Sequence, residues 1–220
     1  MQQYKYLVSG ALMLFCGSAI QAQTTSGCGS LENHYGPFDY RTASKQQKSL
    51  VEDNHFTPSI ESLIKDHDTP FAVDISYTLR VFPNHHRALV TMQRLADREK
   101  VDKPASAQWP MACYYERAIR YQPNDTMARM LFAVYLTKRN QIADASRQLD
   151  EVVKLADDNP FTHYNAGLIF LDMKNYDRAL AQAHLAAKLG FTRPELKDRL
   201  VAEGKWAEPP QQTVPPPKAP

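Results

Sequence analysis

The fold is indicated most clearly by residues 121–190, which read YQPNDTMARMLFAVYLTKRNQIADASRQLDEVVKLADDNPFTHYNAGLIFLDMKNYDRALAQAHLAAKLG. This stretch contains one 34-residue unit twice, because similar residue types recur at that interval. The matching positions are Ala133 and Gly167, Ile142 and Tyr176, Ala145 and Ala179, Leu155 and Leu189, and, over three units, Ala118, Val152 and Ala186. A fixed period of this length is typical of an array of helix-turn-helix repeats. The stretch predicts a binding scaffold and does not identify its ligand.

Small residues at the recurring positions have a packing reason. The first helix of each unit is expected to cross the second helix at a small residue, because a larger side chain would separate the two axes. Small residues further along the second helix press it against the next unit, and an aromatic residue fills the core. We therefore predict that the repeat geometry depends on Ala133, Ala145, Gly167, Tyr176, Ala179 and Ala186.

The last unit resembles the tetratricopeptide repeat (TPR) family in Tyr164-Asn165-Ala166-Gly167, Asn175-Tyr176, Ala179 and Ala186. Ala166 stands where the family usually has Leu, and Arg129 stands where it has an aromatic residue. The resemblance covers residues 84–190, and residues 57–206 more loosely. Residues 36–41 and 82–89 also resemble a group of uncharacterised exported repeat proteins of proteobacteria. The resemblance implies an all-α fold, a TPR-type α-solenoid of helix-turn-helix repeats.

Helical signals on both sides of the regular units extend the expected array. Six prolines in residues 209–220 favour an extended or disordered end. A Pro-rich and charged stretch at residues 100–110 reads as a loop inserted between two helices. We expect an irregular aromatic-containing segment at 23–54, a leading helical pair at 55–83, a divergent unit with a loop insertion at 84–123, regular units at 124–157 and 158–191, a capping helix at 192–206 and a disordered Pro-rich tail at 207–220.

Residues 1–22 read as a signal peptide. Lys5 precedes an apolar run at residues 7–20, which is too short to span a bilayer about 30 Å thick. Cleavage is expected after Ala22, and an uncleaved anchor is the alternative. The mature chain would be almost neutral, and no concentrated basic patch suggests nucleic-acid binding. We predict a periplasmic protein with no membrane insertion after cleavage.

Two of the three cysteines, Cys28 and Cys113, remain after cleavage. An even number in an oxidising compartment favours a disulfide, with lipid attachment at Cys28 as the alternative. Cys113 is expected on the outer face of its helix, where a free thiol would be a liability. A Cys28–Cys113 bond would close a loop of 85 residues and add roughly 4 kcal/mol of stability. Two cysteines alone do not predict a metal site.

The aromatic segment, residues 34–41, reads HYGPFDYR. Its three large rings are costly to leave in water, so the segment is expected to pack against another surface. We favour its own repeat domain as that surface, and a partner protein is the alternative. We expect Asp39 and Arg41 to form an internal ion pair.

The family resemblance also implies that the first helices of the units line a concave groove. Its expected lining is apolar with charge at the edges, which suits a peptide or an amphipathic helix. The groove is either open for a partner or filled by another element of the same chain. Arg87, Val90 and Arg94 would add to it from the divergent unit, and its main residues are Met127, Met130, Val134, Lys138, Phe161, Tyr164, Asn165, Leu168 and Leu171.

No enzyme motif is present: the chain has no phosphate-binding Gly-rich loop, no H-E-x-x-H and no G-x-S-x-G. The adjacent His85 and His86 are expected to cap and pack near a turn. We therefore predict an exported scaffold that binds another envelope protein or peptide, with no catalytic residue, cofactor or metal. The alternatives are a structural or oligomerising subunit with a filled groove, and an envelope enzyme with an unrecognised site. The sequence does not predict the oligomeric state.

Overall fold

The computed structural model describes residues 27–64 and 68–209, and these ranges contain ten α-helices and no strand. The all-α prediction is confirmed. The predicted signal peptide and residues 210–220 of the predicted tail lie outside the described residues. No helix in the described ranges combines the length and hydropathy needed to cross a membrane. The helices are α1 (Lys45–His55), α2 (Pro58–Ser62), α3 (Phe71–Val81), α4 (His86–Glu99), α5 (Met111–Tyr121), α6 (Thr126–Lys138), α7 (Ile142–Leu155), α8 (Pro160–Asp172), α9 (Tyr176–Lys188) and α10 (Glu195–Ala202).

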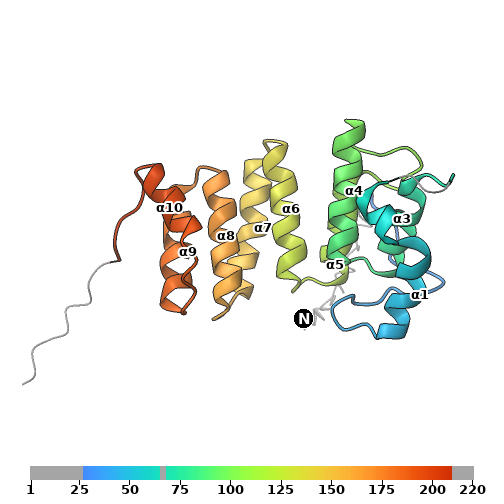
Figure 1. The fold of residues 1–220 in the computed structure, drawn as a ribbon, viewed down its shortest axis with the longest axis horizontal. Helices are drawn as coiled ribbons and strands as arrows, with labels where there is room; N and C mark the ends of the chain where they lie inside the picture. Colours follow the sequence, from blue (N-terminus) through green and yellow to red (C-terminus); the bar gives the residue numbers. More distant parts are fainter. Residues whose placement is uncertain (1–26, 65–67, 210–220) are drawn as a thin grey trace, which may run out of the picture.

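The helices follow one another along the long axis of the molecule, from α1 at one end to α10 at the other (Figure 1). Helices α2, α4, α6, α8 and α10 contact one another in that order and form one row, which we call the groove layer. Helices α3, α5, α7 and α9 pack against this row. The closest pairs are α6 with α7 and α8 with α9, which are the two regular units.

The two regular units share backbone features as well as side chains. Asn140 and Lys174, 34 residues apart, both turn the chain with positive φ, 58° and 59°. Each turn leads into the second helix of its unit. The first helices also begin alike, because Asp125 accepts a hydrogen bond from the Ala128 amide and Asn159 accepts one from the Thr162 amide. The repeat seen in the sequence is therefore also a repeat of turns and caps.

The predicted small residues lie where helices meet. Ala133, Ala145 and Ala179 are completely buried, and Ala186 is nearly so. A Cβ placed on Gly167 would lie only 2.5 Å from Cδ2 of Leu196, on α10, and 3.3 Å from Cβ of Gln182. Gly167 therefore permits close approach of both α9 and α10 to α8. Tyr176 is half-buried and donates a hydrogen bond to Glu203.

The irregular segment predicted at residues 23–54 is wrong in part, because α1 occupies residues 45–55. Ser44 caps this helix together with Gln47, in a reciprocal capping box. Val51 is the one fully buried residue of α1, so the helix lacks the apolar stripe that sequence patterns detect. The capping box of Ser44 and Gln47 was the sequence feature that could have predicted α1.

The aromatic segment packs on the protein's own helices, as favoured above. Phe38 and Tyr40 lie against Phe82 in a small apolar cluster with Val51 and Val81, and Tyr35 contacts Phe38 edge to face. This cluster is separate from the main core between the two rows. The predicted ion pair also forms, with Arg41 Nη2 at 2.7 Å from Asp39 Oδ2.

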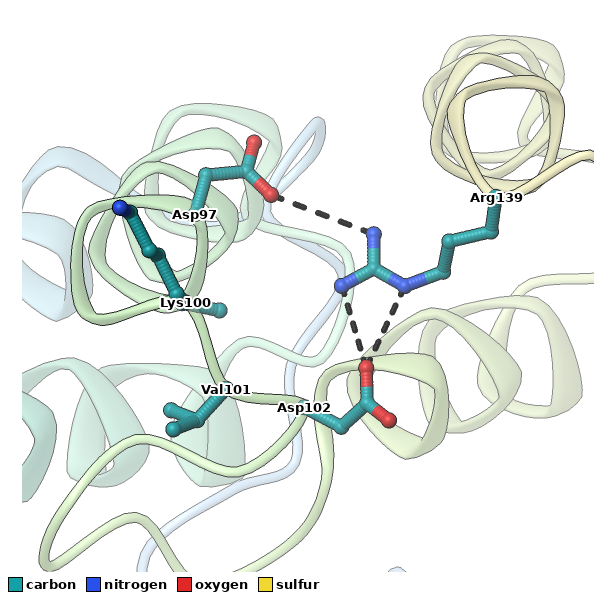
Figure 2. Close-up of a pocket in the computed structure, with 6 residues that line it drawn as sticks. Asp97, Lys100, Val101, Asp102 and Arg139 are labelled. Atoms are coloured by element: carbon teal, nitrogen blue, oxygen red, sulfur yellow. Dashed lines mark hydrogen bonds and ion pairs between the residues drawn. The ribbon is translucent and has the colours of Figure 1, made fainter.

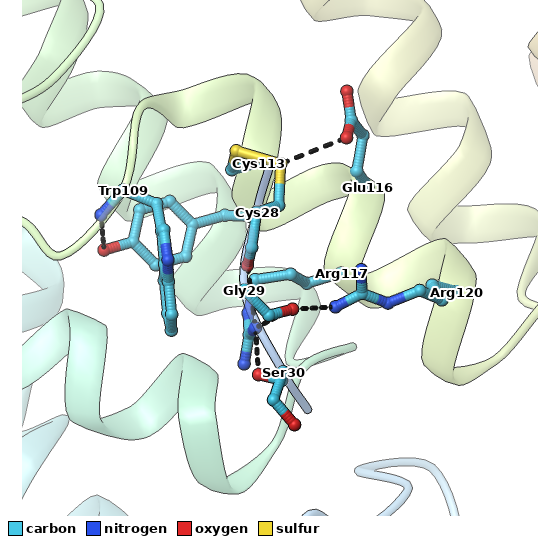
Figure 3. The surroundings of a disulfide bond; sticks show 9 residues. Cys28, Gly29, Ser30, Trp109, Cys113, Glu116, Arg117 and Arg120 are labelled. Carbon is cyan, nitrogen blue, oxygen red and sulfur yellow. Dashed lines mark hydrogen bonds between the residues drawn. A yellow bond between two sulfur atoms is a disulfide. The ribbon is translucent and has the colours of Figure 1, made fainter. Parts of the chain in front are cut away.

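The predicted disulfide between Cys28 and Cys113 is present and joins the start of the described chain to α5 (Figure 3). The buried Arg117 donates hydrogen bonds to the carbonyls of Cys28 and Ser30, and its guanidinium lies 3.8 Å from the Trp109 ring centroid. Burial lowers the pKa of Arg117 to about 10. A covalent bond and a buried cation therefore hold the same short segment on α5.

Candidate binding groove

The structure places all nine predicted groove residues on α6 and α8, within the groove layer, and they differ in exposure. Met127 and Phe161 are 41% and 61% exposed, and Lys138 is also exposed. Val134, Asn165 and Leu168 are half-buried, whereas Met130, Tyr164 and Leu171 are buried.

The C-terminal end of the groove layer is covered by the chain itself. The Phe191 ring lies 4.8 Å from the Tyr164 ring, and the Tyr164 hydroxyl donates a hydrogen bond to Glu195 at the start of α10. Arg199 of α10 pairs with Asp172 at 2.6 Å, on the last turn of α8. Helix α10 thus occupies the α8 side of the expected groove.

The N-terminal end is covered by α2. Arg87, on the first turn of α4, forms an ion pair with Glu61 of α2. Arg98, near the end of α4, donates a hydrogen bond to the Leu63 carbonyl just after α2. Between these two covered ends, the seam of α4 and α6 carries exposed apolar side chains, Val90 and Met127.

This seam contains a hollow of about 300 Å³ at the N-terminal half of both helices. Val90, Thr91 and Arg94 line it from α4, and Met127 and Leu131 line it from α6. Glu61, His86 and Arg87 complete the rim. Val90 is 37% exposed, so the hollow has an apolar floor that water reaches. Leu131 was not among the residues predicted for the groove; it lies one turn after Met127, and that spacing could have identified it.

A second hollow, of about 270 Å³, lies on the same α4–α6 seam at the C-terminal ends of the helices (Figure 2). Its lining is polar. Arg139 reaches Asp97 of α4 at 3.9 Å and Asp102 of the inserted loop at 3.2 Å, and it stacks on the Tyr135 ring. Lys100 borders the opposite side. The inserted loop is therefore tied to the turn between α6 and α7.

A polar network that includes the buried Asn84 and Asp125 holds His86, one of the residues at the rim of the first hollow. His86 Nε2 lies 2.9 Å from the carboxylate of Asp125, the N-cap of α6. Asp125 also accepts a hydrogen bond from Asn84, which in turn donates to Asp39 of the aromatic segment. The Arg41 guanidinium lowers the pKa of Asp39 to about 2. The aromatic segment thereby helps to set the position of His86 at the rim.

His85 belongs to a second network on the same turn. Its Nδ1 accepts a hydrogen bond from the Ala88 amide and caps α4, so its Nε2 carries the proton and donates to Glu52 at 3.0 Å. The Tyr40 hydroxyl donates to the same carboxylate. Burial lowers the pKa of His85 to about 4, so the ring is neutral at pH 7. The prediction of a capping histidine is confirmed for His85.

Within the described ranges, the one set of side chains with metal-ligand geometry is Cys28, Cys113 and Glu116. Its two sulfurs are joined in the disulfide, so they are not free thiolate ligands.

No protein-family model matches the chain, and a search of curated proteins gave no match. The TPR resemblance therefore rests on the sequence residues quoted above.

Proposed function

We propose that this protein is an exported TPR-type α-solenoid that binds a segment of another envelope protein in the groove between α4 and α6, without catalysing a reaction. The observation that carries the proposal is the open hollow at Val90 and Met127. The chain covers both ends of its groove layer but leaves these apolar side chains in water. Open apolar surface of this kind marks interaction sites.

The repeated turns and buried small residues support the proposed scaffold, and the disulfide supports the proposed export. Recurring turns at Asn140 and Lys174 and buried small residues favour stacked units, and stacked units provide extended binding surfaces. Disulfides persist in oxidising compartments, which agrees with a signal peptide at residues 1–22.

The groove is tested by placing a charge in it. Met127→Asp changes an exposed side chain and should leave the fold intact, whereas Tyr164 is a poor choice because it is buried. A photo-crosslinking residue at Leu131 should join the partner in intact cells. Met127→Asp should reduce that product about tenfold or more, because exchanging the apolar Met side chain for a hydrated carboxylate costs at least about 1.4 kcal/mol of apolar contact and desolvation. Val201→Asp, on exposed α10 surface, is the matched control. Equal crosslinking in both variants would remove this groove from the function.

The second candidate is a structural or oligomerising subunit. It is favoured by the coverage of both groove ends, at Arg87 by α2 and at Tyr164 by α10. The particle mass in solution, measured with and without residues 207–220, separates the two. A mass above one chain that falls on removing this tail supports the structural subunit, and a monomer in both cases supports the scaffold.

A further inference from the structure

The α4–α6 seam carries more cations than carboxylates. Along α4, Arg87, Val90, Arg94 and Arg98 follow one another at helical spacing on the groove side. The side chains that line the two hollows include four cations, Arg87, Arg94, Lys100 and Arg139, and three carboxylates, Glu61, Asp97 and Asp102. The excess lies at the first hollow, where Arg87 and Arg94 accompany one lining carboxylate, that of Glu61. It would attract an acidic partner.

Arg94 is the cation best placed to receive a new carboxylate. Arg87 already pairs with Glu61, and Arg98 is held by the Leu63 carbonyl and the Phe71 ring. Among the described residues, no carboxylate lies within ion-pair distance of Arg94, which makes a long hydrogen bond to the Glu61 carbonyl and acts on the Glu61 carboxylate at longer range. Its guanidinium lines the hollow beside Val90.

The spacing of the charged side chains beside the first hollow suits a helical occupant. The second hollow lies at the other end of α4, and the Lys138–Asp97 ion pair crosses the seam between the two. Arg87 and Arg94 are two turns apart, roughly 10.5 Å along α4. Met127 and Leu131 face them from one turn of α6. Two carboxylates at positions i and i+7 of a helix have this same separation, with apolar positions i+3 and i+4 between them.

Resting on the proposed function, we infer that the groove binds an acidic amphipathic α-helix of the partner protein, lying along the α4–α6 seam. Apolar side chains at i+3 and i+4 of that helix contact Val90, Met127 and Leu131. Carboxylates at i and i+7 face Arg87 and Arg94, and the one facing Arg94 forms a charge-assisted pair that is absent from the free protein. This is helix-in-groove recognition with a defined charge register.

The test is a selection of displayed random peptides of about 16 residues, roughly four helical turns, on the full chain with its disulfide intact. The selected peptides are expected to share acidic residues at i and i+7 and apolar residues at i+3 and i+4. In fluorescence polarisation, Arg94→Glu should raise Kd about tenfold or more, because it removes a charge-assisted hydrogen bond and places a like charge beside the peptide's carboxylate. A peptide with its acids changed to Lys should bind Arg94→Glu better than the parent protein. Arg193→Glu, outside the seam, should leave Kd within about twofold.

The outcomes separate this inference from the proposed function. In one group of outcomes, the selected peptides lose binding with Met127→Asp, so the groove is correct. If those peptides lack acidic residues, are Pro-rich and extended, or bind Arg94→Glu normally, the acidic helix alone is overturned. Failure to select any peptide, or binding that ignores Met127→Asp, overturns the groove and the acidic helix together.

Discussion

Replacing Gly167 by Ala tests how tightly α10 closes the groove layer on α8. Ala is the better helix former by about 1 kcal/mol in a helix interior. Its Cβ, however, would lie 2.5 Å from Cδ2 of Leu196, which would have to move by about 1 Å to reach ordinary contact. Overpacking of this kind costs about 1–3 kcal/mol. We expect Gly167→Ala to lower the free energy of unfolding by about 1 kcal/mol net.

Gly167→Ala should instead raise the free energy of unfolding when Leu196 is already Ala. Leu196→Ala alone removes a buried side chain and should cost about 2–5 kcal/mol. It also removes the atom that Gly167→Ala would strike, so the nearest contacts left are Cβ of Gln182 at 3.3 Å and the Ala179 carbonyl at 3.5 Å. Helix propensity then dominates, so Gly167→Ala should stabilise the Leu196→Ala protein by about 0.5–1 kcal/mol.

Urea unfolding of the four proteins measures this cycle, with the disulfide intact. The expected coupling energy is about 2 kcal/mol, well above the few tenths expected for independent sites. An equal effect of Gly167→Ala in both backgrounds would show that α10 does not pack on α8 as described, and that the C-terminal end of the groove is open.

Three further predictions concern the N-terminal half. Replacing Cys28 and Cys113 by Ala should lower the free energy of unfolding by about 4.5 kcal/mol, the chain-entropy value for an 85-residue loop, and the loss should be matched by reducing the parent protein before urea unfolding. The pKa of His85 is 6.5 in the unfolded chain and about 4 in the folded protein, so the unfolded chain binds more protons between these pH values. The free energy of unfolding should therefore fall by about 3 kcal/mol from pH 6.5 to pH 4. His85→Asn should make the free energy of unfolding less dependent on pH in that range. Arg117→Met leaves buried carbonyls unpaired and should cost about 2–3 kcal/mol in thermal or urea unfolding, whereas Arg147→Met, at an exposed site, should change stability by less than about 0.5 kcal/mol.

The helices of the regular units could be predicted from sequence because the caps and turns agree there with the pattern of buried side chains. Helices α6 and α7 lie within the unit predicted at 124–157, since Asp125 caps one and the turn at Asn140 precedes the other. Helix α1 could not be found by periodicity, because Val51 is its one buried residue. Its stability comes from the capping box and from packing on α3, and the second of these is a contact between distant residues.

The groove was harder to predict than the helices. The family resemblance implies that Met127 and Tyr164 lie on the first helices of their units, which are α6 and α8, but it does not show what covers each of them. Tyr164 is buried by Phe191 and α10, elements that follow the repeat. The hollow at Val90 depends on the separation of α4 from α6, which involves the divergent unit and its inserted loop. How exposed a groove side chain is depends on the elements that pack against it, and repeat spacing alone does not specify those elements.

The disulfide also determines how the chain would carry mechanical load. The bond between Cys28 and Cys113 encloses the aromatic segment and helices α1 to α4 in a covalent ring. A force applied at residue 27 would pass through the sulfur atoms directly to α5 and bypass those four helices. Reduction would place them in series with the rest, so that their unfolding would release a contour length of roughly 300 Å, at about 3.5 Å per residue. Single-molecule extension with and without a thiol reductant would show this as a missing or an added unfolding step.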